Sequence, residues 1–206
     1  MKRRDARQQP HEHEETWRVF AAIPLPSPVH HRIAEAIAFL QRRGWRAKWV
    51  DPYNSHITVK FYGNVPVAQL PALQDALAAS SQASQPFTLQ VAGAGIFPSL
   101  RQPRVIWLGL IGDLAPLTVL HERVEAASVA LGYQAEHRPF QPHITLARLR
   151  PDDTIPPRGI EAALHELGAL PPVVLPVTTL TLYRSVLRPS GPVYTELYQF
   201  PLGGST

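Results

Sequence analysis

The residues best suited to chemistry lie in two short segments of the chain, each with a histidine and a threonine separated by one isoleucine. One segment begins at His56 and the other at His143, and the threonines are Thr58 and Thr145. An imidazole gives or takes a proton near neutral pH, and a hydroxyl can donate a hydrogen bond to a charged oxygen. We therefore take these four residues as candidate catalytic residues, with the histidines as general acid and general base.

The period of a β-strand explains why both segments keep this spacing. In a strand, residues two apart point to the same face, so each histidine shares a face with its threonine. The opposite face would carry Ile57 and Val59 in one segment and Ile144 and Leu146 in the other. Two such strands side by side would present four polar side chains. A purely structural role would be the better explanation for one isolated histidine, but two copies that both keep the threonine argue against it.

Residues next to the two segments are candidates for binding a substrate. Lys60 has the strand parity of the first histidine, so we expect it near the site, although a lysine facing solvent is an equal alternative. Arg148 has a guanidinium suited to phosphate, but its parity is that of the apolar face, so it reaches the site only if the strand ends or bulges after Leu146. The ring of Phe61 could stack on a base, whereas for Phe20 we favour core packing.

Composition limits the class of protein. The chain has 206 residues, of which 45% are hydrophobic and 17% charged, which indicates a globular protein. The absence of cysteine excludes disulfides, thiolate metal sites and a cysteine nucleophile. A net charge of +4 mildly favours an anionic partner. No apolar run approaches the roughly 20 residues of a membrane helix, and the N-terminus lacks a signal-peptide core. We therefore expect a cytoplasmic protein with no membrane contact.

The order of the expected elements is an α+β pattern with no glycine-rich phosphate loop. We read residues 1–16 as a disordered tail and residues 17–206 as one bilobal domain. The His-Glu-His-Glu run at 11–14 lacks the spacing of a metal motif, so we expect no metal site. Helices are expected from Ser27 to about Arg42 and over 67–79, 114–131 and 160–167, and strands over 17–23, 56–62, 87–96, 105–110, 143–149, 173–177, 180–187 and 194–200.

The two segments and their flanks resemble a known family. The matching stretches are Arg18–Ile23, His56–Gly63, Pro142–Arg148, Leu182–Ser185 and the closing Tyr194–Leu202. They resemble the 2H phosphoesterase superfamily and, more narrowly, the bacterial and archaeal RNA 2′,3′-cyclic phosphodiesterases, historically called 2′-5′ RNA ligases. The resemblance covers roughly residues 17–202. It implies two pseudo-symmetric lobes, each an antiparallel sheet with helices packed outside, enclosing a central cleft.

The resemblance also implies a reaction. A 2′,3′-cyclic phosphate at an RNA end would be opened to a 2′-phosphate without metal or other cofactor. His56 would protonate the departing 3′-oxygen, His143 would activate water, and Arg148 would bind the phosphate. The residues alone are symmetric between the two histidines, and reversed roles would give the opposite regiochemistry. The expected partners are RNA 3′ ends or cyclic nucleotides, and we expect a monomer.

Other functions remain open at this level. The same residues could join RNA ends through a 2′-5′ linkage or cleave 2′-5′ oligonucleotides, and the absence of a recognisable adenylation motif means that such a ligation would use no nucleotide cofactor. A non-catalytic module that binds RNA ends through a basic cleft is a third hypothesis, disfavoured by the complete histidine and threonine pairs. The remaining histidines of the predicted domain are read as surface residues: His30, His31, His121, His137 and His165.

Overall fold

The computed structural model describes residues 14–156, 159–189 and 191–203, which form two antiparallel sheets and four α-helices. The strands are β1 (Thr16–Pro24), β2 (Lys48–Trp49), β3 (His56–Pro66), β4 (Phe87–Ser99), β5 (Gln102–Ile111), β6 (Ile144–Arg148), β7 (Val173–Val177), β8 (Thr179–Arg188) and β9 (Gly191–Pro201). The helices are α1 (Ser27–Arg42), α2 (Leu70–Gln82), α3 (Ala115–Ala130) and α4 (Ile160–Gly168). The expected α+β class is confirmed. Of the tail expected over residues 1–16, residues 1–13 lie outside the described part, together with His11, Glu12 and His13 of the His-Glu run, and β1 already begins at Thr16.

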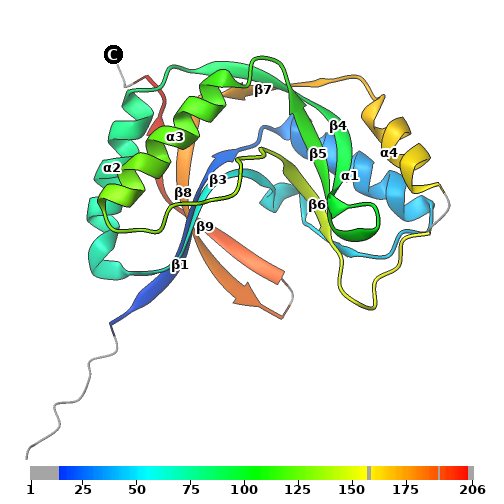
Figure 1. The fold of residues 1–206 in the computed structure, drawn as a ribbon, viewed down its shortest axis with the longest axis horizontal. Helices are drawn as coiled ribbons and strands as arrows, with labels where there is room; N and C mark the ends of the chain where they lie inside the picture. Colours follow the sequence, from blue (N-terminus) through cyan, green and yellow to red (C-terminus); the bar gives the residue numbers. More distant parts are fainter. Residues whose placement is uncertain (1–13, 157–158, 190, 204–206) are drawn as a thin grey trace, which may run out of the picture.

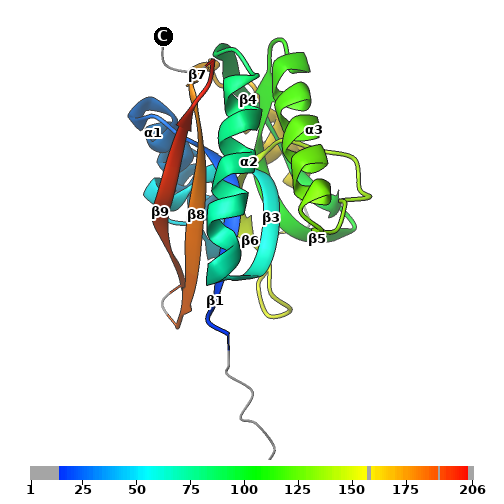
Figure 2. The ribbon, with the colours of Figure 1, turned by 90° about the vertical axis from the view of Figure 1, so that its left-hand side faces the viewer.

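The first lobe consists of the sheet with strand order β3-β1-β8-β9 and the helices α2 and α3. Figure 1 shows these helices on the left of the molecule, and Figure 2 shows them in front of this sheet. Strand β1 lies between β3 and β8, and its residues Val19, Ala21 and Ile23 are almost fully buried in the core. The other face of the same strand carries Phe20 and Ala22, which belong to a separate small cluster beside the first histidine.

The second lobe has the strand order β2-β6-β5-β4-β7 and is packed against α1 and α4, on the right in Figure 1. As the periodicity predicts, Ile33, Ile37 and Leu40 of α1 are buried. Pro28 lies in the first turn of this helix, where a missing backbone N–H does no harm. The expectation of two lobes, each an antiparallel sheet with helices outside, is confirmed.

The chain exchanges helices between the lobes. Helix α1 follows β1 of the first sheet but contacts β6 and β7 of the second, and α3 follows β5 of the second sheet but contacts β3 of the first. Each sheet is therefore covered in part by a helix that follows, along the chain, a strand of the other lobe. We propose on this ground that residues 17–206 fold as the single bilobal domain expected from the sequence.

Strand β3 contains a β-bulge directly after its threonine. In its pairing with β1, Thr58 lies opposite Ala22 and Lys60 lies opposite Ala21, which leaves Val59 as an extra residue without its own partner. Val59 and Lys60 are consecutive and both buried, whereas a regular strand would bury only one of them. The alternation of side chains is therefore reversed from this point on.

Strand β6 contains a bulge at the equivalent place. Thr145 lies opposite Trp107 of β5 and Ala147 lies opposite Ile106, so Leu146 is the extra residue. Leu146 and Ala147 are consecutive and both fully buried. The two bulges thus follow the threonine in both copies and reverse the alternation in the same way.

The reversal decides which side chains share a face with the two threonines. Phe61 in β3 and Arg148 in β6 emerge on this face, and both are exposed, Phe61 by 49%. Lys60 turns to the opposite side and is only 6% exposed. We call the sheet surface that carries the histidines and threonines the inner face of each lobe.

The inner face of the second lobe depends on a close approach at Gly95. Trp107 is the cross-strand neighbour of both Thr145 and Gly95, and its ring lies 5.0 Å from that of Phe97 between centroids. A Cβ atom on Gly95 would overlap the indole of Trp107. The absence of a side chain at this position therefore gives Trp107 its place beside Thr145.

We predict that Gly95→Ala lowers the free energy of unfolding by about 1–3 kcal/mol, because the indole must shift in a packed layer. Gly168→Ala is the matched control, since the added methyl group would make only ordinary van der Waals contact with Gly93. Denaturant unfolding monitored by tryptophan fluorescence measures both. Equal stability of the two variants would contradict this explanation of Gly95.

Candidate active site

The two histidines are held by the same hydrogen bond. The Nδ1 atom of His56 lies 3.2 Å from the carbonyl oxygen of Asn54, and the Nδ1 atom of His143 lies 2.7 Å from that of Gln141. A carbonyl oxygen can only accept, so Nδ1 carries the proton and donates in both rings. In the neutral form, Nε2 of each ring is then the atom left to take a proton.

The first histidine lies among aromatic rings. Its ring centroid is 4.6 Å from that of Phe20, 5.1 Å from Tyr194 and 6.1 Å from Tyr183. Phe20 is buried, as expected, but its ring packs against the site and not only within the core. His143 has one aromatic neighbour, Phe97, with 5.0 Å between the ring centroids in an edge-to-face arrangement.

The environment lowers the pKa of both histidines. Burial lowers the pKa of His56 to about 4, with smaller contributions from the positive charges of Arg148 and His143, while the carbonyl of Asn54 acts in the opposite direction. Burial also lowers the pKa of His143, again assisted by Arg148 and opposed by the carbonyl of Gln141. The unprotonated form of each ring is therefore favoured in the free protein.

The two lobes are in contact at the strands that carry the histidines. His143 and Arg148 belong to the second lobe, yet their charges act on His56 in the first, and β3 and β6 lie in contact. Thr58 is exposed and Thr145 half-buried on the same inner faces. The two histidines thus lie near each other, and each shares an inner face with its own threonine.

Arg148 reaches the site because of the bulge in β6. The sequence makes its participation conditional on a break in the strand after Leu146, and the extra residue is Leu146 itself. The charge of Arg148 lowers the pKa of both histidines and opposes the burial that raises the pKa of Tyr194. A guanidinium thus lies near the imidazoles from both lobes.

The expectation that Lys60 is a second cation at the site is wrong. Its Nζ atom lies 2.7 Å from Oε1 of Glu125 and 3.1 Å from the carbonyl oxygen of Gln134, on the helix side of the sheet. The physical reason is the bulge, which gives residue 60 the side that strict alternation assigns to residue 61. Phe61 takes the place on the inner face, and the guanidinium of Arg18 lies 4.5 Å from its ring centroid.

Sequence reasoning missed three residues near the site. Arg18 shares its parity in β1 with Phe20, and its charge acts on Tyr194. Lys48 in the short strand β2 is the cross-strand neighbour of Arg148 and is exposed. The parity of Arg18 was a usable signal, whereas the contributions of Tyr194 and Lys48 depend on strand pairing that the local pattern does not contain.

Two kinds of feature are absent from the described residues. They contain no group of three or more histidine, aspartate or glutamate side chains arranged to hold a metal ion. None of the helices in this part of the chain combines the length and the apolar character needed to cross a membrane.

Comparison with known proteins identifies the family. The profile of the 2'-5' RNA ligase superfamily matches residues 25–188. The chain belongs to this superfamily. A member from Thermus thermophilus, named RNA 2',3'-cyclic phosphodiesterase, is 34% identical over 199 residues, which cover 91% of each chain. A protein of the same name from Methanothermobacter thermautotrophicus is 29% identical over 188 residues, covering 90% of this chain and 98% of the relative.

A solved structure of the superfamily confirms the fold. The crystal structure of E. coli LigT complexed with 3'-AMP superposes with a TM-score of 0.72 at 30% identity, covering 92% of this chain and 100% of LigT. The resemblance inferred from the two histidine segments and their flanks is confirmed.

We predict that His56 makes the protein sensitive to acid. Its pKa in the folded state is about 4, below the ordinary value of 6.5 that applies after unfolding. As the pH falls, the unfolded state binds this proton first, so the contribution to stability is complete above pH 6.5 and is lost as the pH falls from 6.5 to about 4. The difference between the two pKa values corresponds to about 3 kcal/mol in the free energy of unfolding.

The measurement is the free energy of unfolding at pH 7 and at pH 4 for the wild type and for His56→Phe, whose ring suits the aromatic surroundings. The variant should lose about 3 kcal/mol less than the wild type between these two pH values. His31→Phe, a change at an exposed histidine, is the control and should keep the wild-type loss. If His56→Phe shows the same loss as the wild type, His56 is not the buried neutral group described above.

Proposed function

We propose that this protein hydrolyses 2′,3′-cyclic phosphate ends of RNA to 2′-phosphates, with His56 and His143 as the acid–base pair. The observation that supports this most strongly is the pair of equivalent imidazoles, contributed by the two lobes with the same tautomer and coupled electrostatically. The names of the relatives support the choice of substrate.

The proposed reaction is a displacement at phosphorus. A neutral imidazole removes a proton from water as the water oxygen bonds to phosphorus. A protonated imidazole gives its Nε2 proton to the ribose oxygen as the bond from that oxygen to phosphorus breaks. Since Nδ1 of each ring is engaged with a carbonyl, Nε2 serves both roles. Each proton transfer typically contributes roughly 10²- to 10⁴-fold to the rate.

The substrate itself supplies the charge that the acid needs. Both histidines start neutral near pH 7 because their pKa values are lowered. A phosphate anion placed next to them favours the protonated form and raises the pKa again. The family resemblance assigns the acid role to His56. The opposite assignment would protonate the 2′-oxygen and leave a 3′-phosphate, so the regiochemistry of the product decides between the two.

Binding of the phosphate and the base falls to the neighbouring residues. We propose that the hydroxyls of Thr58 and Thr145 donate hydrogen bonds to the non-bridging phosphate oxygens, where charge gathers in the transition state. The guanidinium of Arg148 pairs with the same phosphate. The exposed ring of Phe61, with Arg18 beside it, offers a surface on which a base can stack.

The remaining expectations concern cofactors and assembly. We propose that the reaction needs no metal or other cofactor, and that the substrates are RNA 3′ ends or cyclic mononucleotides. Because both histidines come from the same chain, the site is complete without a second copy, which supports a monomer. A cytoplasmic location is consistent with an RNA substrate.

Turnover of a 2′,3′-cyclic mononucleotide in the presence of EDTA tests this proposal. We expect the wild type to form the 2′-phosphate, and His56→Ala and His143→Ala each to lower kcat by about 10²- to 10⁴-fold. His31→Ala should retain wild-type activity. An absence of turnover, or histidine variants as active as the wild type, would refute the two-histidine mechanism.

The pH profile gives a second prediction. The base works only when neutral and the acid only when protonated, so kcat/KM should be bell-shaped. Since the pKa values of both free histidines are lowered, kcat/KM should already fall as the pH rises above about 6.5. The profile of kcat, which reports the complex with the anionic substrate, should lie at higher pH. A monotonic profile, or a kcat profile at lower pH than that of kcat/KM, would contradict the scheme.

Two alternative functions remain, a ligation at the same site and RNA-end binding without catalysis. With a 5′-hydroxyl in place of water as the nucleophile, the same displacement would form a 2′-5′ linkage as the bond from phosphorus to the 3′-oxygen breaks. Incubation of cleaved RNA halves without a longer product would remove this possibility. A module that only binds RNA ends would keep its function in both histidine variants, with an affinity that falls as salt is added.

A further inference from the structure

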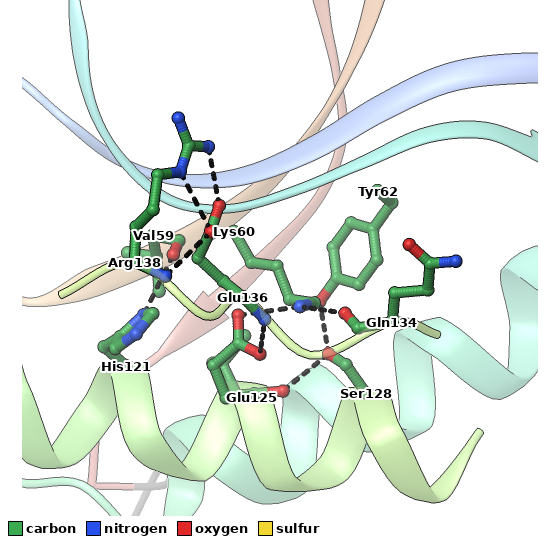
Figure 3. Close-up of polar contacts among 10 residues, drawn as sticks. Val59, Lys60, Tyr62, His121, Glu125, Ser128, Gln134, Glu136 and Arg138 are labelled. Carbon is green, nitrogen blue, oxygen red and sulfur yellow. Dashed lines mark hydrogen bonds and ion pairs between the residues drawn. The ribbon is translucent and has the colours of Figure 1, made fainter. Parts of the chain in front are cut away.

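Helix α3 meets the bulge of β3 with polar side chains, although the inner side of a helix is ordinarily apolar. His121, Glu125 and Ser128 follow one another at intervals of four and three residues, so they form one stripe along the helix. Figure 3 shows this stripe facing β3, with hydrogen bonds leading from it to the strand. A polar stripe in this position indicates that these side chains pair with polar groups of β3.

The first contact holds the extra residue of the bulge. The Nδ1 atom of His121 lies 3.1 Å from the carbonyl oxygen of Val59, and it donates because that oxygen can only accept. The other side of the imidazole stacks on Phe140, with 4.0 Å between ring centroids. The expectation that His121 is a surface residue is therefore wrong, since it is half-buried and its ring is held by the Val59 carbonyl and by Phe140.

The second contact holds the lysine that the bulge turns inward. Glu125 and Lys60 form an ion pair of 2.7 Å, and their side chains are only 16% and 5% exposed. The ammonium group also donates to the carbonyl oxygen of Gln134 at 3.1 Å, and the carboxylate accepts from the backbone N–H of Glu136 at 3.3 Å. The charge of Lys60 is thus neutralised on the helix side of the sheet.

The third contact lies at the next irregularity of the strand. Phe61 lies opposite Phe20 and Gly63 opposite Val19, so Tyr62 has no partner of its own in β1. Its hydroxyl lies 3.0 Å from Oγ of Ser128. The stripe on α3 therefore contacts the strand at residues 59, 60 and 62 from one side, and Phe61 emerges on the other.

We infer that His121 and Glu125 are positioning residues, which hold the bulge of β3 and thereby place Thr58 and Phe61 on the inner face beside His56. This rests on the function proposed above, because it assigns these residues a part in the same reaction. We call His121, Glu125 and Ser128 the α3 clamp. None of its members lies on the inner face; the clamp acts through the strand.

The clamp selects between two arrangements of the strand. Without the bulge, strict alternation would turn Lys60 to the inner face and Phe61 to the helices, as the sequence pattern itself predicts. The bulge leaves Val59 outside the pairing register with β1 and turns the ammonium of Lys60 to the buried side, and buried polar groups are unfavourable unless they are paired. His121 and Glu125 supply those partners. In β6 the residue equivalent to Lys60 is Ala147, which is buried and needs no such partner.

A single and a double substitution test the ion pair of the clamp. In Glu125→Leu the lysine loses its partner, so the strand should shift toward the regular alternation and kcat should fall about 10- to 100-fold through misplacement of Thr58. In Lys60→Met/Glu125→Leu the side chain at position 60 is apolar and remains inside, so most of the activity should return. Glu122→Gln, on an exposed position of the same helix, should behave as the wild type.

Chemical labelling of lysine amines gives a readout independent of activity. Lys60 should be protected in the wild type and become labelled in folded Glu125→Leu, while exposed Lys48 is labelled in both. A merely stabilising role would lower the unfolding midpoint without exposing Lys60 in the folded protein. Continued protection of Lys60, or a double variant as impaired as Glu125→Leu, would overturn the inference. An inactive wild type would instead refute the proposed function, and the labelling would still decide on the clamp.

Discussion

A regular β-strand can show only every second side chain to one face, and this constraint shapes the whole site. A histidine and a threonine two residues apart satisfy it. Regular alternation would place the residue two positions after the threonine on the same face. Both strands break the pattern by a bulge directly after the threonine. The bulges bring Phe61 and Arg148 onto the inner faces. The bulge in β3 also buries Lys60, whose charge is paired by Glu125 of helix α3.

The two lobes repeat each other in backbone but not in chemistry. Equivalent positions hold Phe61 and Arg148, so one lobe offers an aromatic surface and the other a cation. The two imidazoles share a tautomer, yet His56 lies among three aromatic rings and His143 beside one. Acid–base catalysis needs two groups that differ in protonation state. The nearly symmetric scaffold surrounds its two histidines with different side chains, and in the proposed reaction the bound phosphate then favours the protonated form of one of them.

The parts of this site that sequence could predict are those that local period determines. The shared face of each histidine and threonine and the apolar backs of the strands follow from spacing, and the two lobes follow from the family resemblance. The bulges depend on how β3 pairs with β1 and β6 with β5, which no local pattern contains. For this reason the side of Lys60 was predicted wrongly and that of Arg148 only conditionally. The exchange of α1 and α3 between lobes was missed because periodicity identifies an apolar face but not the sheet that covers it.

The central claim is that both histidines act on one phosphorus. A crystal structure of the protein with a bound 2′-nucleotide, the proposed product, tests it most directly. The claim predicts that Nε2 of His56 and Nε2 of His143 each lie within hydrogen-bond distance, about 3 Å, of oxygens on the same phosphorus. Arg148 should contact that phosphate as well. A phosphate held by only one histidine, or bound away from both, would contradict the account.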